Sequence, residues 1–162
     1  DMYFWKSVPQ FPTTFAAVYD DGTLMKLHGD LGFLLRKANV GVNADYYLWQ
    51  LTNETNPWHK PVFETTVYSR FSILNPNTNK MKLTVEPQAY FMLYQGEGHG
   101  DIANVSIFDL GLEVNYYYSS VLRIFADVNN LLGLEDERYL NYPNQRANIL
   151  IGLSYSFGGH KE

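Results

Sequence analysis

The final stretch of the chain alternates strictly between apolar residues and small or polar ones, and this pattern constrains the fold more than any other. Between positions 146 and 157, one parity reads Ala, Ile, Ile, Leu, Tyr and Phe, and the other reads Asn, Leu, Gly, Ser and Ser. Because successive side chains of a β-strand point to opposite faces, the segment predicts a strand with one apolar and one mostly polar face. A long strand that ends on an aromatic residue is typical of a β-barrel in lipid, with its apolar face outward.

The same alternation recurs along the chain. It predicts seven long strands, near 24–36, 37–49, 62–73, 81–94, 105–117, 121–131 and 146–157. No charged residue falls on the apolar parity of any of them. Such a charge would cost about 2–4 kcal/mol near the middle of a bilayer. The sequence therefore predicts an all-β fold, an antiparallel up-and-down transmembrane β-barrel of seven or eight strands.

The two parities give two sets of site residues. The lipid-facing set is Leu31, Val42, Val67, Phe71, Leu112, Ile124, Ile149, Ile151, Leu153 and Phe157. The lumen-facing set is Asp30, Asp45, Glu64, Arg70, Glu86, Asp109, Glu113, Arg123 and Asp127. The second set is expected to form a mixed-charge ladder that hydrates the interior, and it could also line a selective path or seat a plug.

Alternation alone does not distinguish an outward apolar face from an inward one. The alternative is a soluble β-barrel that binds an apolar ligand, with Leu31, Val42, Val67, Leu112 and Ile151 in its core. Composition favours the membrane interpretation, because 16% of the residues are aromatic and only 18% are charged. The net charge of -5 argues against a nucleic-acid partner, and the absence of cysteine excludes disulfides. No apolar run is long enough for a transmembrane helix.

Short and long connections alternate along the chain. The short ones lie at 36–37, 74–80 and 118–120, and the long ones at 50–61, 95–104 and 132–145. Outer-membrane barrels have short periplasmic turns and long extracellular loops, so Phe157 is expected at the periplasmic side. The expected parts are an extracellular loop or weak strand at 1–22, barrel strands at 23–157 and a tail at 158–162.

An odd strand number is unusual for a closed single-chain bacterial barrel. Either Phe11–Tyr19 supplies an eighth strand, or the chain is the C-terminal piece of a larger barrel, which we favour because lipid forbids an open sheet edge. The first residues do not read as a signal peptide, so a mature, truncated or never exported chain is expected. Pro87 interrupts a predicted strand, and a β-bulge is expected there.

Several motifs resemble a known family. The segments Phe125–Leu132 and Tyr139–Arg146, followed by a strand ending at Phe157, are similar to the C-terminal end of TonB-dependent outer-membrane receptors. Leu27–Leu31 and Trp58–Pro61 resemble a receptor-like group common in Bacteroidetes.

The resemblance covers roughly residues 19–157. It implies a barrel of about 22 strands with an internal plug, in the outer membrane of a Gram-negative bacterium. It also implies uptake of a scarce solute, energised from the inner membrane. The implied partners are membrane lipid, a plug domain, the remaining barrel strands and a surface lipoprotein. The chain departs from the family in showing no plug or energy-coupling motif. A small closed porin-like barrel is therefore a second expectation.

The candidate metal ligands are few. His28 and Asp30 share one face, but two ligands are too few for a zinc site. Residues Glu97, His99 and Asp101 alternate with glycines in a loop. This pattern fits a metal site, but the preference of glycine for tight turns explains it equally well. No metal or cofactor is predicted.

Other motifs have structural explanations. Trp58 and Tyr94 are expected to anchor the chain at the membrane interface, with ligand contact as the alternative. The charges of Glu135–Arg138 are expected to form a solvated loop cluster. A lipid-modifying enzyme would need a nucleophile with a base, and Ser69 or Ser72 with His28 does not make a complete set. The protein is therefore expected not to be an enzyme.

Overall fold

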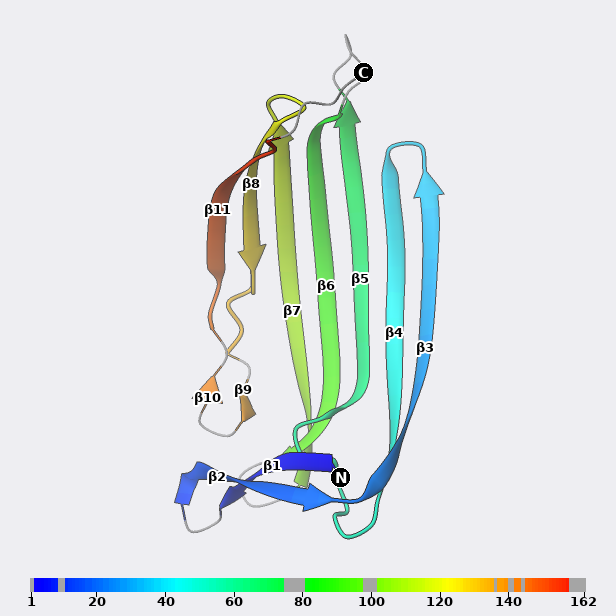
Figure 1. Ribbon diagram of the computed structural model, residues 1–162, viewed down its shortest axis with the longest axis vertical. Coiled ribbons are helices and arrows are strands. Elements are labelled where there is room, and N and C mark those ends of the chain that lie inside the picture. The colour runs from blue at the N-terminus through cyan, green and yellow to red at the C-terminus, as the bar shows by residue number, and fades with distance from the viewer. Residues whose placement is uncertain are drawn as a thin grey trace.

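The computed structural model shows an antiparallel, all-β chain without a helix among the residues it describes, which are 2–8, 11–74, 81–97, 102–135, 137–139, 142–143 and 145–157. Seven strands form one up-and-down sheet in the order β11-β8-β7-β6-β5-β4-β3 (Figure 1). Their bounds are β3 Gly22–Leu35, β4 Ala38–Leu51, β5 Pro61–Leu74, β6 Met81–Glu97, β7 Ile102–Tyr117, β8 Leu122–Asn129 and β11 Asn148–Tyr155. The predicted all-β, antiparallel order of strands is confirmed.

The sheet is open, with β3 and β11 at its two edges (Figure 1). Every residue of the 14-residue strand β3 is exposed. An edge of this length presents a row of backbone amide and carbonyl groups to which a further strand could pair.

The connections differ between the two ends of the sheet. The tight turns at 36–37 and 118–121 lie at one end, and the longer segment 52–60 lies at the other (Figure 1). The connection from β8 to β11 contains a short hairpin of β9 (Glu137–Tyr139) and β10 (Tyr142–Pro143). Residues 75–80 and 98–101 lie outside the described part of the chain.

The first strands form a hairpin of their own. β1 (Met2–Val8) pairs with β2 (Phe11–Asp20), and the hairpin lies across the end of the sheet that holds segment 52–60 (Figure 1). The expectation that Phe11–Tyr19 adds an eighth strand to the sheet is therefore wrong. The physical reason is at Asp20, whose carboxylate binds the backbone of segment 52–60 at the point where the chain turns into β3.

Pro87 does not create the predicted bulge, because β6 stays in register with both neighbouring strands there. The β5–β6 ladder instead has a gap between the pair Tyr68–Gln88 and the pair Phe71–Val85. Proline has no amide hydrogen to donate, so the sheet loses pairing at this point without changing register.

The buried apolar side chains gather at the hairpin end. Met92, Tyr94 and Ile107 form the one cluster of buried residues found in the described chain, on the same strand parity as the charges. Tyr94 is 1% exposed and Trp58 is 5% exposed, so their expected role as membrane-interface anchors is wrong. Trp58 belongs to segment 52–60, and the ring of His59 in the same segment lies against that of Tyr94.

Candidate solute-binding face

The register places all the predicted lumen residues on one side of the sheet, which we name the polar face. They are Asp30, Asp45, Glu64, Arg70, Glu86, Asp109, Glu113, Arg123 and Asp127. Residues that are directly paired in neighbouring strands share a face, so these side chains form rows across the sheet.

One cluster of the polar face is centred on Asp45. Its carboxylate lies 2.7 Å from His28 Nδ1 and 3.1 Å from Lys26 Nζ. The expected partnership of His28 with Asp30 is therefore replaced by one across strands. The lysine cation and the contact with His28 explain how Asp45 is accommodated beside Glu64, the like charge directly opposite it.

The neighbouring carboxylate of Glu64 is held by phenols rather than by cations. Tyr47 donates its hydroxyl to Glu64 Oε2 at 2.9 Å, and Tyr90 donates to Oε1 at 3.1 Å. A tyrosine hydroxyl can satisfy a carboxylate without adding charge. The predicted mixed-charge ladder thus exists only in part, because hydroxyl and amide groups separate several of the like charges.

A hydrogen-bonded group of polar side chains, which we name the polar knot, consists of Thr84, Glu113, Asn115 and Arg123 on β6, β7 and β8. The amide nitrogen of Asn115 donates to Thr84 at 3.2 Å and to Glu113 at 3.0 Å, while its oxygen accepts from Arg123 at 3.1 Å. Asn115 is 2% exposed and Thr84 is 1% exposed. Buried polar groups need such partners, so this knot fixes neighbouring charged side chains in place.

Two further predicted residues have structural partners. Asp109 accepts the backbone amide of Asn130 at 2.8 Å, and Asp127 accepts the amide of Asn129 at 3.3 Å. Asn130 has a φ of 48° and binds the backbone of Leu134 and Gln145, so it closes the base of the long connection after β8. Asp109 therefore stabilises a loop base in addition to facing the polar side.

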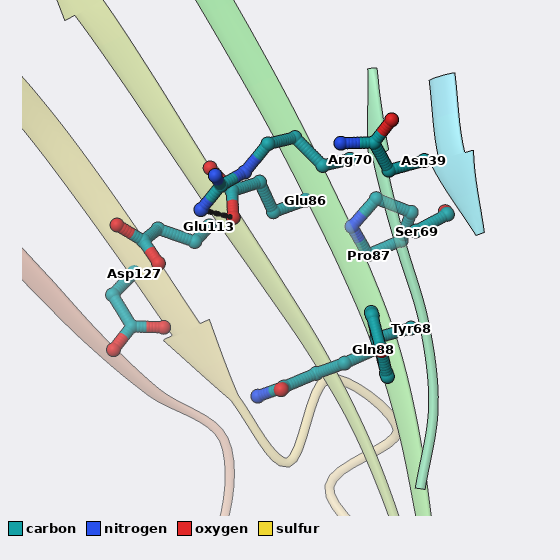
Figure 2. Close-up of a pocket in the computed structure, with 9 residues that line it drawn as sticks. All are labelled: Asn39, Tyr68, Ser69, Arg70, Glu86, Pro87, Gln88, Glu113 and Asp127. Atoms are coloured by element: carbon teal, nitrogen blue, oxygen red, sulfur yellow. Dashed lines mark ion pairs between the residues drawn. The ribbon is translucent and has the colours of Figure 1, made fainter. Parts of the chain in front are cut away.

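The polar face contains a depression of about 340 Å³ at the Pro87 gap (Figure 2). Two rows of side chains build it. The first row runs through Asn39, Arg70, Glu86, Glu113 and Asp127, and the second holds Tyr68 and Gln88. Arg70 Nη2 forms an ion pair with Glu86 Oε2 at 2.8 Å, drawn as a dashed line in Figure 2.

Glycines allow the second row to lie flat. A Cβ atom at Gly41 would come within 2.4 Å of the Tyr68 ring, and one at Gly111 would come within 2.8 Å of the Gln88 amide. Each large side chain therefore rests on the bare backbone of the adjacent strand. The depression gains a floor made of an aromatic ring and an amide.

The opposite side of the sheet, which we name the apolar face, carries the predicted lipid-facing residues that lie in strands, and Phe157 follows the end of β11. Val42 and Leu112 are half-buried, and the others are exposed: Leu31, Val67, Phe71, Ile124, Ile149, Ile151, Leu153 and Phe157. Leu31 is 63% exposed and Ile151 is 72% exposed, so the core required by the soluble alternative is not formed by these residues. Their contact with lipid stays a prediction.

The hairpin end is fastened by Asp20, which is buried. Its carboxylate accepts the backbone amides of Asn53 at 2.9 Å and Glu54 at 2.8 Å, and the side-chain amide of Asn53 at 2.8 Å. Hydrogen bonds to the ionised form, that from Glu54 foremost, hold the pKa of Asp20 below its usual value despite the opposing effect of burial. This carboxylate stays charged at neutral pH and joins hairpin to loop.

Charge and ring contacts strengthen the same junction. Lys6 Nζ lies 3.4 Å from Glu54 and 4.8 Å from the Trp58 ring centroid, and Trp58 donates to Glu54 at 2.8 Å. The Phe4 and Trp49 rings meet edge to face at 6.0 Å. The hairpin thus covers one end of the polar face.

Some predicted motifs lie outside the described residues. They are the His99–Asp101 part of the glycine-rich loop and the tail at 158–162; the side chains of Glu97 and of 136–138 are likewise not described. Within the described chain, no group of three or more histidine, aspartate or glutamate residues could hold a metal ion.

Sequence reasoning missed the two flat side chains and the role of Asp20. The flat placement of Tyr68 and Gln88 did have a signal in the sequence. Gly41 and Gly111 lie on the polar parity, and each pairs with one of these large residues. The junction made by Asp20 gave no local signal, because the residues that it binds in segment 52–60 lie 33 and 34 positions away.

Neither a protein-family model, nor a curated protein, nor a solved structure matches the chain. The resemblance to TonB-dependent receptors therefore stays a prediction. In the described part of the chain no helix is long and apolar enough to cross a membrane.

Proposed function

We propose that this chain forms part of the wall and lumen of an outer-membrane β-barrel in a Gram-negative bacterium. The barrel is that of a TonB-dependent receptor-like transporter that takes up a small solute. In this proposal the apolar face contacts lipid, the polar face lines the solute path, and neither face performs catalysis.

The observation that carries the proposal is the placement of buried and exposed side chains. Leu31, Val67 and Ile151 are exposed on a face that carries no charge among the described side chains, whereas Thr84 and Asn115 are buried on the face that carries the charges. A soluble domain buries its apolar parity, and a barrel in lipid reverses this arrangement.

Strand length and the open edges agree with this proposal. β3, β4 and β5 have 14 residues each. A strand of that length with a barrel tilt rises about 35 Å, which exceeds the apolar band of about 25 Å. Because lipid tolerates no unpaired strand edge, β3 and β11 need further strands of the same barrel. A plug and a surface lipoprotein are the other proposed partners.

Topology in the cell tests the proposal. The chain has no cysteine, so one introduced thiol gives an unambiguous signal. Thr55→Cys lies in the long segment 52–60 and Lys37→Cys in the opposite tight turn, and both positions are exposed. With the full-length protein in intact cells, a membrane-impermeant maleimide should label Thr55→Cys alone.

Permeabilising the outer membrane supplies the control, because Lys37→Cys should then be labelled to the same extent. Equal labelling of both positions before permeabilisation, or recovery of the protein in the soluble fraction, would contradict the membrane assignment.

A further inference from the structure

The depression at the Pro87 gap differs from the rest of the polar face in having a floor. Tyr68 and Gln88 are paired across β5 and β6, and each lies over a glycine of the outer neighbouring strand. In Figure 2 the Gln88 side chain extends along this floor, while Arg70, Glu86 and Glu113 stand together on the adjoining row. A flat floor beside a charged wall leaves room for a small solute.

The charges around the depression are unbalanced. Arg70 is its one lining cation, and it pairs with Glu86. The other two lining carboxylates, Glu113 and Asp127, accept hydrogen bonds from the neutral amides of Asn115 and Asn129. These contacts satisfy oxygen atoms but add no positive charge, and the charge of Arg70, which also acts on Glu113, is shared with its ion-pair partner Glu86.

The nearby cation that could have balanced them is directed elsewhere. Arg123 donates to Asn115 Oδ1, and its guanidinium lies 5.1 Å from the centroid of the Phe125 ring. The carboxylates of Glu113 and Asp127 lie on directly paired residues of β7 and β8. Like charges on paired residues repel, so a cation placed between them would be stabilised.

We propose that this depression binds the cationic group of a small organic solute. The ammonium or guanidinium group lies against Glu113 and Asp127, and the body of the solute rests on Tyr68 and Gln88. The Tyr68 ring also attracts a cation through its face. The inference rests on the proposed function, since it names the class of solute that the lumen admits.

Binding to the full-length protein in detergent tests it. The probes are 1,4-diaminobutane, 1,4-butanediol and succinate, which share a four-carbon backbone, differ in charge and partition little into micelles. Titration calorimetry should detect the diamine and show weaker binding, by about tenfold or more, for the uncharged diol and for succinate, because charge-assisted contacts are lost. Added salt should weaken diamine binding, because these carboxylates are partly exposed.

Three variants locate the site. Glu113→Gln and Asp127→Asn should each weaken diamine binding about threefold to fivefold, the range of a partly exposed charge contact. Asp30→Asn removes the same charge from the polar face outside the depression, and should change affinity less than twofold, as surface pairs often do.

A fourth variant keeps every charge. Gly41→Ala places a methyl group where the Tyr68 ring lies, so it should displace the ring and weaken diamine binding. The ring is the far end of a flexible side chain, so the sheet can keep its register. Far-ultraviolet circular dichroism of each variant checks that strand content is unchanged.

Three results would overturn the inference: the diol or succinate binding as tightly as the diamine, Asp30→Asn acting as strongly as Glu113→Gln, or Gly41→Ala leaving affinity unchanged. Absence of diamine binding by a protein that passes the two-cysteine topology test refutes this inference alone. Failure of the topology test refutes the proposed function, whatever the calorimetry shows.

Discussion

The hairpin end and the middle of the sheet bury their side chains in different ways. At the hairpin end, Phe4 of the hairpin, Trp58 of segment 52–60 and Tyr94 of the sheet are all buried, and Asp20 joins the hairpin to that segment. In the middle of the sheet, apolar side chains such as Val67 are exposed, and the polar face holds hydrogen-bonded charges.

One strand parity of β6 serves two purposes along its length. Met92 and Tyr94 continue the parity of Glu86 and Gln88 along β6, yet they belong to an apolar cluster. The ring of His59 in segment 52–60 lies against Tyr94, and Phe15 of the hairpin lies against His59. The other parity of β6 stays apolar from Met81 to Leu93. The part of the polar face that is shielded from water is therefore decided by which segments lie against it, and not by the alternation of residue types along the strand.

The largest effect is expected from a charge on the apolar face. Val67→Arg should destabilise the folded protein in lipid vesicles by about 2–4 kcal/mol if residue 67 lies near the bilayer midplane. Urea titration followed by tryptophan fluorescence measures the change. Thr66→Arg, one residue away on the polar face, is the matched control and should cost far less; equal costs would break the distinction between the faces.

A smaller effect is expected in the polar knot. Asn115→Ala removes the amide shared by Thr84, Glu113 and Arg123, and should lower the free energy of unfolding by about 1–3 kcal/mol because buried partners lose their hydrogen bonds. Asn43→Ala, on the same face outside the knot, is the control. A loss no greater than that of the control in urea titration would show that Asn115 is not a fixed buried group.

Asp20→Asn should open the hairpin end while leaving the sheet folded. The variant removes the charge that holds segment 52–60, so hydrogen exchange of the Asn53 and Glu54 amides should accelerate. Mass spectrometry of peptides from this segment measures the rate, and peptides from β7 should be unchanged. Faster exchange throughout the sheet would contradict the separation of the two regions.

The same junction should depend on pH. The pKa of Asp20 is lowered in the folded protein, so its stabilising contribution is complete above the ordinary aspartate value of 3.8 and is lost as pH falls below it through the folded-state pKa. In Asp20→Asn this acid-dependent loss should be absent. A wild-type junction that opens instead as pH rises through neutrality would contradict the assignment to Asp20.

The smallest effect is expected at the ion pair of the depression. Arg70→Gln should cost about 0.2–1 kcal/mol, because Arg70 is exposed and water screens its pair with Glu86. Urea titration at low salt should resolve the change, and added salt should reduce it. A loss as large as that of Asn115→Ala would mean that this pair, too, is effectively buried.

The sequence predicted the sheet because alternation is a local property of each strand. The seven ranges follow from the alternation of residue types, and the predicted charges share one face for the same reason. The prediction of a bulge at Pro87 was wrong. A strand can accommodate a missing amide hydrogen by losing pairing with one neighbouring strand, as β6 does, and does not need the extra residue of a bulge.

Contacts between side chains that lie far apart in the sequence were harder to predict from the sequence. The hairpin end depends on Asp20 meeting segment 52–60, and nothing near Asp20 in the sequence signals that contact. Trp58 and Tyr94 looked like interface aromatics, because composition does not reveal which aromatics a hairpin covers. The floor of the depression needed the register that pairs Gly41 with Tyr68.

The most direct test of the two faces is a spin-label scan along β5, with single cysteines at positions 64 to 71 in the full-length protein in lipid vesicles. Oxygen concentrates in the hydrocarbon, whereas a water-soluble nickel chelate does not enter it. The account predicts that labels at 67 and 71 collide more with oxygen and those at 64, 66 and 70 more with the chelate, with a period of two residues. Oxygen collisions that favour the even positions, or no alternation, would contradict it.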